Sequence, residues 1–413
     1  MRTQANWAGN HHYRAERFAQ PQSVHELAEL IGGARAVRIL GSRHSFNDIV
    51  DSDDLIIGTA GLPTSIEIDP VARTVTVGGG VRYGDLAQAL NEAGWALHNL
   101  ASLPHISVAG AVATATHGSG DSNGNLATAV RGIRLVTGTG EIVDLRRGDD
   151  GFDGAVVALG ALGAVVELTL DIEPTFTVRQ RLFAGLEWDA VASRFDEIFS
   201  SAYSVSLFTL WDEASISLAW IKERVDEPAR VGGDFFGAIA EPAPRHMIAG
   251  MDVRNTTEQL GIAGPWNERL AHFRFEFTPS AGEEIQSEYL VPRSRAVEAI
   301  DAVRALGPQL RGLLQISEIR SVAADDLWLS TASGTDVIGL HFTWVRDTAG
   351  VEAVLPPLEA ALYPLGARPH WGKEFCGLDA ATMYPRLGDF RALADRYDPE
   401  GRFRNEFVRR VIG

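Results

Sequence analysis

Hydrophobic positions in the first part of the chain switch between helical and strand-like spacing. Apolar side chains recur at helical spacing over residues 24–31, directly after a Ser23 and Glu26 capping pair, so we predict a helix that ends at Gly32. The short apolar run Val37–Leu40 follows and predicts a buried strand. The first stretch of candidate chemistry lies in the turn after this strand.

The same change of spacing continues along the chain. Alternating or apolar runs predict sheet segments over three further stretches, 65–78, 130–145 and 165–172. The first two contain central turns and read as hairpins. Helical spacing predicts helices over 83–93 and 152–159. We place a domain boundary at Pro174, after the last of these strands.

Beyond this boundary the pattern mixes helices with strands, and 226–265 is too poorly patterned to assign. Strands are predicted over four stretches, 273–277, 286–290, 314–322 and 337–345. Two of them place polar side chains on one face, Glu318 with Arg320 and His341 with Thr343. Polar alternation is most often a face that meets water. Both segments are otherwise largely apolar, however, and these side chains supply the hydrogen-bond partners that a polyhydroxylated molecule needs.

Composition narrows the possible partners and location. A chain of 413 residues, 45% of them hydrophobic, predicts two domains with a large core. The net charge of −17, without any basic block, argues against nucleic acid or an anionic membrane as a partner. The start lacks a secretory pattern, and no apolar run reaches the roughly 18 residues of a membrane span, so we predict a cytoplasmic enzyme. The single cysteine, Cys376, excludes an intrachain disulfide, and we expect it to be buried.

The turn at 41–45 has the composition of an anion-binding loop. Gly41 allows a close backbone approach, Ser42 and Ser45 add hydroxyl donors, and His44 places a nucleophilic imidazole beside them. An ordinary loop histidine is the alternative. The glycine run 78–80 is different, because it lacks the G-x-G-x-x-G spacing of a dinucleotide-binding loop.

A second stretch, 100–120, is small, rich in hydroxyl groups and free of acids, lysine and arginine. Its candidate residues are Ser102, Ser107, Gly110, Thr114, Thr116, His117 and Gly118. Such a segment lets the backbone lie flat against a large planar or phosphorylated ligand, and a tightly packed Ala/Gly helix is the alternative. Near the C-terminus, Lys373 follows Trp371 and Gly372, which indicates partial burial of a lysine that would otherwise be a surface charge.

Seven short motifs together provide a more specific signal. They are NWAGN at 6–10, GSRHSF at 41–46, LASLPHISVAG at 100–110, THGSG at 116–120, EIR at 318–320, HFTW at 341–344 and HWGK at 370–373. This set spans nearly the whole chain and resembles the alditol-oxidising members of the vanillyl-alcohol oxidase family of flavoproteins, which also contains the aldonolactone oxidases. The resemblance implies an α+β, two-domain fold of the PCMH type. An FAD-binding domain would cover 1–174, a mixed sheet-and-helix substrate domain 175–370, and a segment returning to the FAD domain 371–413.

The resemblance also implies roles for individual residues around the cofactor. His44 would be joined covalently to the 8α-methyl carbon of FAD. The other cofactor-binding residues would be Gly41, Ser42, Arg43, Ser45, Ser102, Ser107, Gly110, Thr114, Thr116, His117, Gly118 and His370. One departure stands out, since Arg43 occupies a position where the family has glycine. Arginine gives up backbone freedom there but places a cation near phosphate.

The implied substrate site consists of Ser102, Glu318, Arg320, His341, Thr343 and Lys373. In the implied reaction the terminal primary alcohol of a linear polyol such as xylitol or sorbitol is oxidised to the aldose, and O2 is reduced to H2O2. His341 is our candidate proton acceptor, and Lys373 would stabilise developing alkoxide charge. A lactone oxidase or dehydrogenase of the same fold is the alternative enzyme, and a carbohydrate-binding flavoprotein without turnover is the non-enzymatic one. We expect a monomer with no metal ion.

Overall fold

Two sheets form the first part of the chain in the computed structural model, which describes residues 5–228, 230–277 and 283–413. A three-stranded parallel sheet has the order β1-β3-β2, and a five-stranded antiparallel sheet has the order β4-β5-β9-β7-β8. The strands are β1 (Arg17–Ala19), β2 (Val37–Leu40), β3 (Leu55–Gly58), β4 (Ile66–Asp69), β5 (Thr74–Gly78), β7 (Val130–Thr137), β8 (Ile142–Arg146) and β9 (Gly163–Asp171). The helices are α1 (Val24–Gly32), α2 (Tyr83–Glu92), α3 (Val108–Ala113) and α4 (Phe152–Val156).

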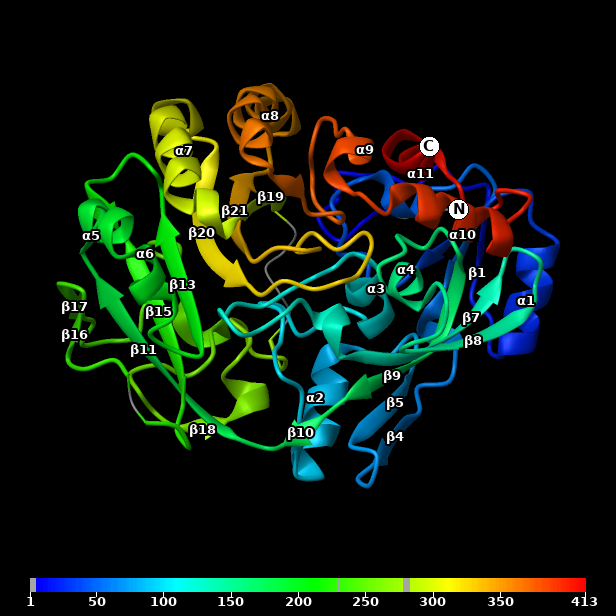
Figure 1. Ribbon diagram of the computed structural model, residues 1–413, viewed down its shortest axis with the longest axis horizontal. Helices are drawn as coiled ribbons and strands as arrows, with labels where there is room; N and C mark the ends of the chain where they lie inside the picture. The colour runs from blue at the N-terminus through cyan, green and yellow to red at the C-terminus, as the bar shows by residue number, and fades with distance from the viewer. Residues whose placement is uncertain (1–4, 229, 278–282) are drawn as a thin grey trace.

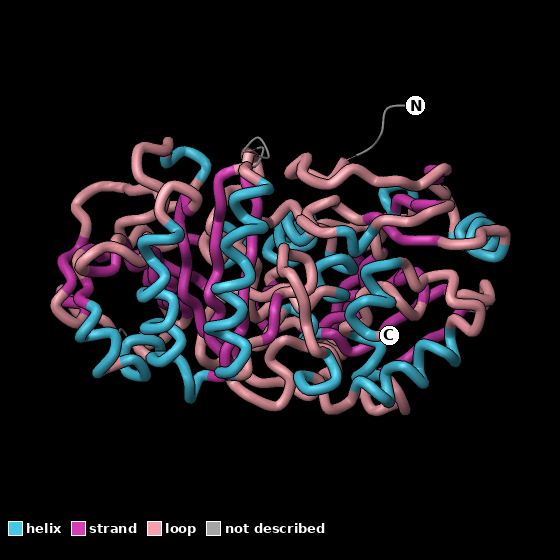
Figure 2. Tube along the Cα trace, turned by 90° about the horizontal axis from the view of Figure 1, so that it is seen from above, coloured by secondary structure: helices cyan, strands magenta, loops and turns pink. Residues whose placement is uncertain are grey.

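A ten-stranded sheet forms most of the second part (Figure 1), with the order β16-β17-β11-β15-β13-β20-β21-β19-β22 and with β18 beside β11. Its strands are β11 (Thr177–Ala184), β13 (Ser204–Thr209), β15 (Leu218–Arg224), β16 (Asp234–Phe235), β17 (Ala238–Ala240), β18 (Gly264–Pro265), β19 (Glu284–Pro292), β20 (Leu314–Val322), β21 (Val337–Val345) and β22 (Arg368–Pro369). Helices α7 (Ala296–Leu310) and α8 (Thr348–Leu362) lie side by side against one face of this sheet (Figure 2). These two helices therefore leave the opposite face of β19, β20 and β21 uncovered.

Short elements complete the architecture. The remaining strand pairs are β6 (Trp95–Ala96) with β10 (Glu173–Pro174), and β12 (Leu186–Glu187) with β14 (Ser215–Ile216). Helices α5 (Trp188–Ser193) and α6 (Phe195–Phe199) precede β13, and α9 (Ala380–Met383), α10 (Leu387–Tyr397) and α11 (Glu406–Ile412) end the chain. None of the helices among the described residues is long and apolar enough to cross a membrane.

The chain packs around two large hydrophobic clusters. The first joins apolar residues of the N-terminal part to the last three helices, for example Leu86 and Phe152 to Phe390 and Phe407. The second lies between the ten-stranded sheet and the helices α7 and α8. Figure 1 shows the C-terminal helices beside the N-terminal strands, so the two ends of the chain belong to the same region of the molecule.

Most predicted elements are confirmed. Helix α1 begins after Ser23, whose Oγ accepts a hydrogen bond of 3.1 Å from the Glu26 backbone nitrogen. The hairpins β4-β5 and β7-β8 form as predicted, and β20 and β21 have the predicted bounds. Sequence patterns of this kind are reliable where a strand is long and one face is consistently apolar.

Three predictions are wrong. The helix predicted over 152–159 ends at Val156, and Leu159 has a positive φ of 52° while its carbonyl binds the buried Arg38. Residues 273–277 do not form a strand, because pairing stops at a single bridge between Phe273 and Thr256 and the chain turns at 275–276. Cys376 is exposed rather than buried.

Candidate active site

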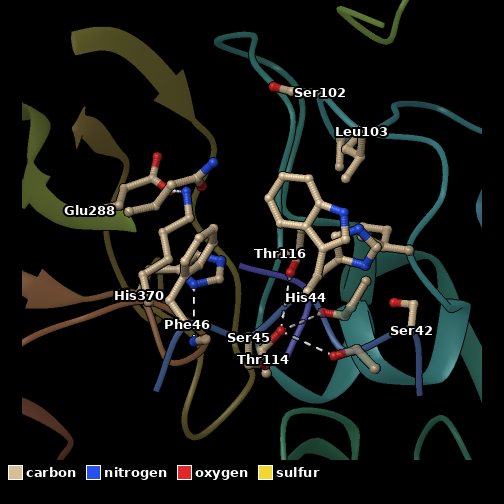
Figure 3. Close-up of a pocket in the computed structure, with 18 of the residues that line it drawn as sticks. Ser42, His44, Ser45, Phe46, Ser102, Leu103, Thr114, Thr116, Glu288 and His370 are labelled. Carbon is tan, nitrogen blue, oxygen red and sulfur yellow. Dashed lines mark hydrogen bonds and ion pairs between the residues drawn. The ribbon is translucent and has the colours of Figure 1, made fainter. Parts of the chain in front are cut away.

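A cavity of about 1110 Å³ is lined by residues from both parts of the chain (Figure 3). One side is formed by the 41–45 turn and by residues of 101–117, and we call it the hydroxyl wall. The other side is formed by β19, β20, β21 and the segment after β22, and we call it the charged wall. Its polar members are Gln286, Glu288, Glu318, Arg320, His341, Thr343 and Lys373.

Glycines bring the two segments of the hydroxyl wall together. The Ser107 backbone nitrogen donates to Ser42 Oγ over 3.1 Å, directly linking the segments. A Cβ atom on Gly41 would lie 2.3 Å from Ser107 Oγ, and one on Gly110 would lie 2.7 Å from the same atom. A side chain at position 41 would therefore push the two segments apart, and one at position 110 would clash with Ser107 inside its own segment. Thr114 and Thr116 are hydrogen bonded to each other over 3.0 Å on this side of the cavity.

His44 occupies the centre of the hydroxyl wall. Its ring stacks on Trp7, with centroids 5.3 Å apart and an interplanar angle of 26°. Neither imidazole nitrogen has a hydrogen-bond partner within 3.5 Å among the described residues. Burial, with smaller contributions from His105 and Arg43, lowers the pKa of His44 to about 4. The ring is therefore neutral at pH 7, and both nitrogens remain free for a ligand that enters the cavity.

The charged wall is built from sheet register. Glu288 on β19 and Glu318 on β20 both pair with His341 on β21, so the three side chains form one row across the sheet. The adjacent row contains Gln286 and Thr343, which are also direct partners. Side chains in directly opposed positions of neighbouring strands share a face. The predicted sharing of one face by Glu318 and Arg320, and by His341 and Thr343, is therefore confirmed.

Glu288 is the centre of the charge network. Its carboxylate lies 2.6 Å from Lys373 Nζ, 2.8 Å from Arg320 Nη2 and 3.2 Å from His117 Nε2. Burial alone would raise the pKa of Glu288, but Lys373, His117 and Arg320 outweigh it and hold that pKa well below its usual range. The carboxylate is ionised at neutral pH, and it neutralises two cations that reach it from different segments.

Glu318 is supported from behind the wall. Its Oε1 lies 2.8 Å from His272 Nε2, and its Oε2 lies 3.6 Å from Arg320 Nε. The other ring nitrogen of His272 lies 3.3 Å from Lys222 Nζ, a buried ammonium that also donates to the Leu270 and Ala271 carbonyls. Burial, against attraction from Glu318, lowers the pKa of Lys222 to about 7 and that of His272 to about 4.

His341 and His370 are buried, and Lys373 beside them is half-buried. Burial and the nearby Lys373 ammonium hold the pKa values of His341 and His370 well below their ordinary range. Burial also lowers the pKa of Lys373, although Glu288 opposes this shift. The two imidazoles are therefore neutral at pH 7 and able to accept protons.

The cavity brings together all but one of the residues singled out in the sequence. The lining includes Gly41, Ser42, Arg43, His44, Ser45, Ser102, Ser107, Gly110, Thr114, Thr116, His117, Glu318, Arg320, His341, Thr343, His370 and Lys373. Gly118 lies behind the lining, where its carbonyl accepts a 2.9 Å hydrogen bond from His117 Nδ1. Its contact with a cofactor stays a prediction.

Sequence reasoning missed Gln286, Glu288, His272 and Lys222. The strand at 286–290 was predicted, and its residues Gln286 and Glu288 alternate at the same period of two as the polar residues on β20 and β21. Applying the same period-two argument to the 286–290 strand would have identified Gln286 and Glu288. His272 and Lys222 lie in segments without any pattern that pointed to the cavity.

Comparison with known proteins decides the family. Residues 15–146 match the family described as FAD binding domain, and residues 279–411 match the family described as D-arabinono-1,4-lactone oxidase. An alditol oxidase from a Streptomyces species, strain IKD472, is 47% identical over 412 residues, or 98% of each chain. The chain belongs to the vanillyl-alcohol oxidase family of flavoproteins.

More distant members of this flavoprotein family also match over nearly the whole length of this chain. An L-gulono-1,4-lactone dehydrogenase from Mycobacterium tuberculosis, strain H37Rv, is 31% identical over 448 residues and 99% of each chain. Among solved structures, cholesterol oxidase from Brevibacterium sterolicum superposes with a TM-score of 0.77 at 15% identity, over 100% of this chain and 96% of that one. The predicted vanillyl-alcohol oxidase-type fold, α+β with an FAD-binding domain, is confirmed.

The residues of the hydroxyl wall fit FAD. Gly41 leaves no side chain where the two segments approach, Gly110 lines the same cavity, and hydroxyl groups of Ser42, Thr114 and Thr116 border it. The unpartnered nitrogens of His44 add a nucleophile in the same wall. A buried polar atom normally has a partner, so His44 points to a ligand that supplies one.

Proposed function

We propose that this chain is an FAD-dependent alditol oxidase. It oxidises the terminal primary alcohol of linear polyols, such as xylitol and sorbitol, to the aldose, and O2 is reduced to H2O2. The observation that supports this best is the charged wall, where three strands aim Glu288, His341 and Glu318 into one cavity beside a family-typical FAD wall. The 47% identity to an alditol oxidase favours polyols as the substrate class.

The hydroxyl wall would hold the cofactor. Gly41, Ser42, Arg43 and Ser45 would wrap its diphosphate, with Ser102, Ser107, Gly110, Thr114, Thr116, His117 and His370 completing the contacts. Bound FAD supplies the acceptor for hydride and, once reduced, the electrons for O2. His44 would be the covalent tether, because it is neutral, unpartnered and within this wall.

The charged wall would bind and deprotonate the substrate. His341 would accept the proton of the reacting hydroxyl, and Lys373 would stabilise the developing negative charge. Ser102, Glu318, Arg320 and Thr343 would hold the remaining hydroxyl groups. Both cations of the wall already have carboxylate partners, so the wall suits a neutral substrate better than an acidic one.

A lactone oxidase or dehydrogenase of the same fold is the second candidate. It is favoured by the match of 279–411 to the D-arabinono-1,4-lactone oxidase family. The two functions share the cofactor wall and differ in the shape of the substrate, a linear polyol against a ring lactone.

Anaerobic mixing of the purified flavoprotein with substrate tests the proposal. We expect xylitol or sorbitol to bleach the flavin absorbance, and admission of O2 to restore it with formation of H2O2. A matched panel of aldonolactones should reduce the flavin much more slowly. Bleaching by lactones alone would replace the polyol proposal with the lactone one, and a protein without flavin absorbance would contradict both.

We also propose the division into an FAD-binding domain over 1–174, a substrate domain over 175–370 and a returning segment over 371–413. The shared packing of the C-terminal helices with the N-terminal part supports this division. A monomeric state and a cytoplasmic location stay predictions from the sequence.

A further inference from the structure

The amide of Gln286 lies between a carboxylate and the proposed base. Its Nε2 donates to Glu284 Oε1 over 2.6 Å, and its Oε1 lies 3.0 Å from His341 Nε2. Glu284, Gln286 and Glu288 share one face of β19 because they are two residues apart. His341 is diagonal to Gln286 across the sheet, since the direct partner of Gln286 is Thr343. A long side chain spans this diagonal.

The chemistry of the three groups fixes the direction of both hydrogen bonds. The amide nitrogen of Gln286 faces Glu284, because Nε2 donates to a carboxylate oxygen there. The amide oxygen of Gln286 must then face His341. An amide oxygen only accepts, so His341 Nε2 must carry a proton. The second ring nitrogen, Nδ1, has no hydrogen bond to any described residue.

We propose that Gln286, oriented by Glu284, is a positioning residue that holds His341 as the Nε2–H tautomer and makes Nδ1 the proton acceptor. The tautomer follows from the contacts alone, whereas its catalytic use rests on the proposed function. When the substrate O–H bond breaks, its proton forms a new N–H bond at Nδ1. The Nε2–H then keeps its acceptor in the amide oxygen of Gln286.

The other charged groups that face His341 have opposite effects on its protonation. Lys373 and Arg320 disfavour the imidazolium, while Glu288 and Glu318 favour it. These groups change the basicity of the ring but make no hydrogen bond to Nε2 in the described part of the chain. The choice between the two tautomers therefore depends on Gln286.

The first test measures the tautomer directly. Selective ¹⁵N labelling of histidine, with His341→Asn to assign the signal, distinguishes a protonated from an unprotonated ring nitrogen. We expect Nε2–H and bare Nδ1 in the wild type at pH 7, and a mixture of tautomers in Gln286→Met, which keeps side-chain length without an amide. A wild-type ring protonated at Nδ1, or an unchanged tautomer in Gln286→Met, would overturn the proposal.

The second test separates positioning from structure. Gln286→Met should slow anaerobic flavin reduction by about 10²-fold at saturating polyol, with the substrate Kd changed by less than about threefold. The exchanged double variant E284Q/Q286E restores the order of donor and acceptor toward His341 Nε2, and we expect it to recover both the tautomer and most of the rate. A double variant as slow as Gln286→Met, with its tautomer still mixed, would contradict the proposed positioning of His341 by Gln286 and Glu284.

A matched control comes from α2. Gln88 donates to Glu92 over 3.0 Å in an exposed pair of the same type, so Gln88→Met should leave the tautomer and the reduction rate unchanged. Failure of the wild type to be reduced by any polyol would refute the proposed function, while the ¹⁵N measurement would still decide the tautomer. The two ideas can therefore fail separately.

Discussion

The two walls of the cavity differ in how they achieve polarity. The hydroxyl wall uses backbone, glycine, hydroxyl groups and a neutral imidazole, and the 100–120 segment contains no acid, lysine or arginine. The charged wall contains the buried Glu288, Glu318 and Arg320 and the half-buried Lys373, and a network of ion pairs neutralises them. A wall of the first kind follows the surface of a large ligand, and a wall of the second kind fixes directional bonds to a small one. Substitutions in one wall should therefore leave the role of the other intact.

The variant His44→Ala should separate the roles of the two walls most clearly. The variant removes the proposed tether, so all of its flavin should be released on acid denaturation, whereas the wild-type flavin should stay with the protein. The solvent-exposed His25 provides the control, and His25→Ala should retain its flavin. Flavin that precipitates with acid-denatured His44→Ala would contradict the tether.

His341→Ala tests the other wall. Loss of the proposed proton acceptor should slow flavin reduction by polyol by about 10²- to 10⁴-fold, because that is the usual contribution of positioned proton transfer. The flavin content should match the wild type, since His341 belongs to the charged wall. The measurement is stopped-flow absorbance at saturating xylitol, and an unchanged rate would remove His341 from the role.

The difference between the walls also explains what the sequence could predict. The hydroxyl wall is formed by two short local segments, so composition alone identified 41–45 and 100–120. The face of each strand in the charged wall is local too, which is why Glu318, Arg320, His341 and Thr343 were found. The period-two pattern of the 286–290 strand could have identified Glu288 as a polar residue on that face. Its role as the centre of the charge network could not be predicted, because that role depends on Lys373, Arg320 and His117, which reach it from three other places in the chain. Such convergence depends on strand order, and no local pattern encodes it.

Glu288→Leu should be the largest stability change in the charged wall. It leaves the buried Arg320 and the half-buried Lys373 without their shared anion, and breaking a buried ion pair in this way costs about 3–5 kcal/mol. Urea unfolding of wild type and variant measures the difference. The exposed pair of Arg295 and Glu298, 2.6 Å apart, offers the comparison, and Glu298→Leu should have little effect. Equal stability of Glu288→Leu and the wild type would show that the cations find other partners.

The buried Lys222 should make the free energy of unfolding depend on pH. Its pKa is about 7 in the folded state against an ordinary value of 10.5, so the unfolded state holds more protons between these limits. The stability of the wild type relative to Lys222→Met should therefore rise with pH above 7, by at most about 1.4 kcal/mol per pH unit. Urea unfolding at several pH values up to 9.5 checks the slope, and a pH-independent difference would contradict the buried titration.

A variant at Arg43 tests whether the hydroxyl wall needs a cation to bind FAD. Its φ of 65° lies in the left-handed region, where glycine is unstrained, so Arg43→Gly should change apoprotein stability by no more than about 1 kcal/mol. Arg73 has a φ of 54° in the turn between β4 and β5, and Arg73→Gly relieves the same strain away from the cavity. In a His44→Ala background, we expect only Arg43→Gly to weaken FAD binding, because it alone removes a cation that lines the cavity. Equal FAD Kd values in the two variants would mean that backbone and hydroxyl groups suffice for the diphosphate, which would make the contrast between the walls complete.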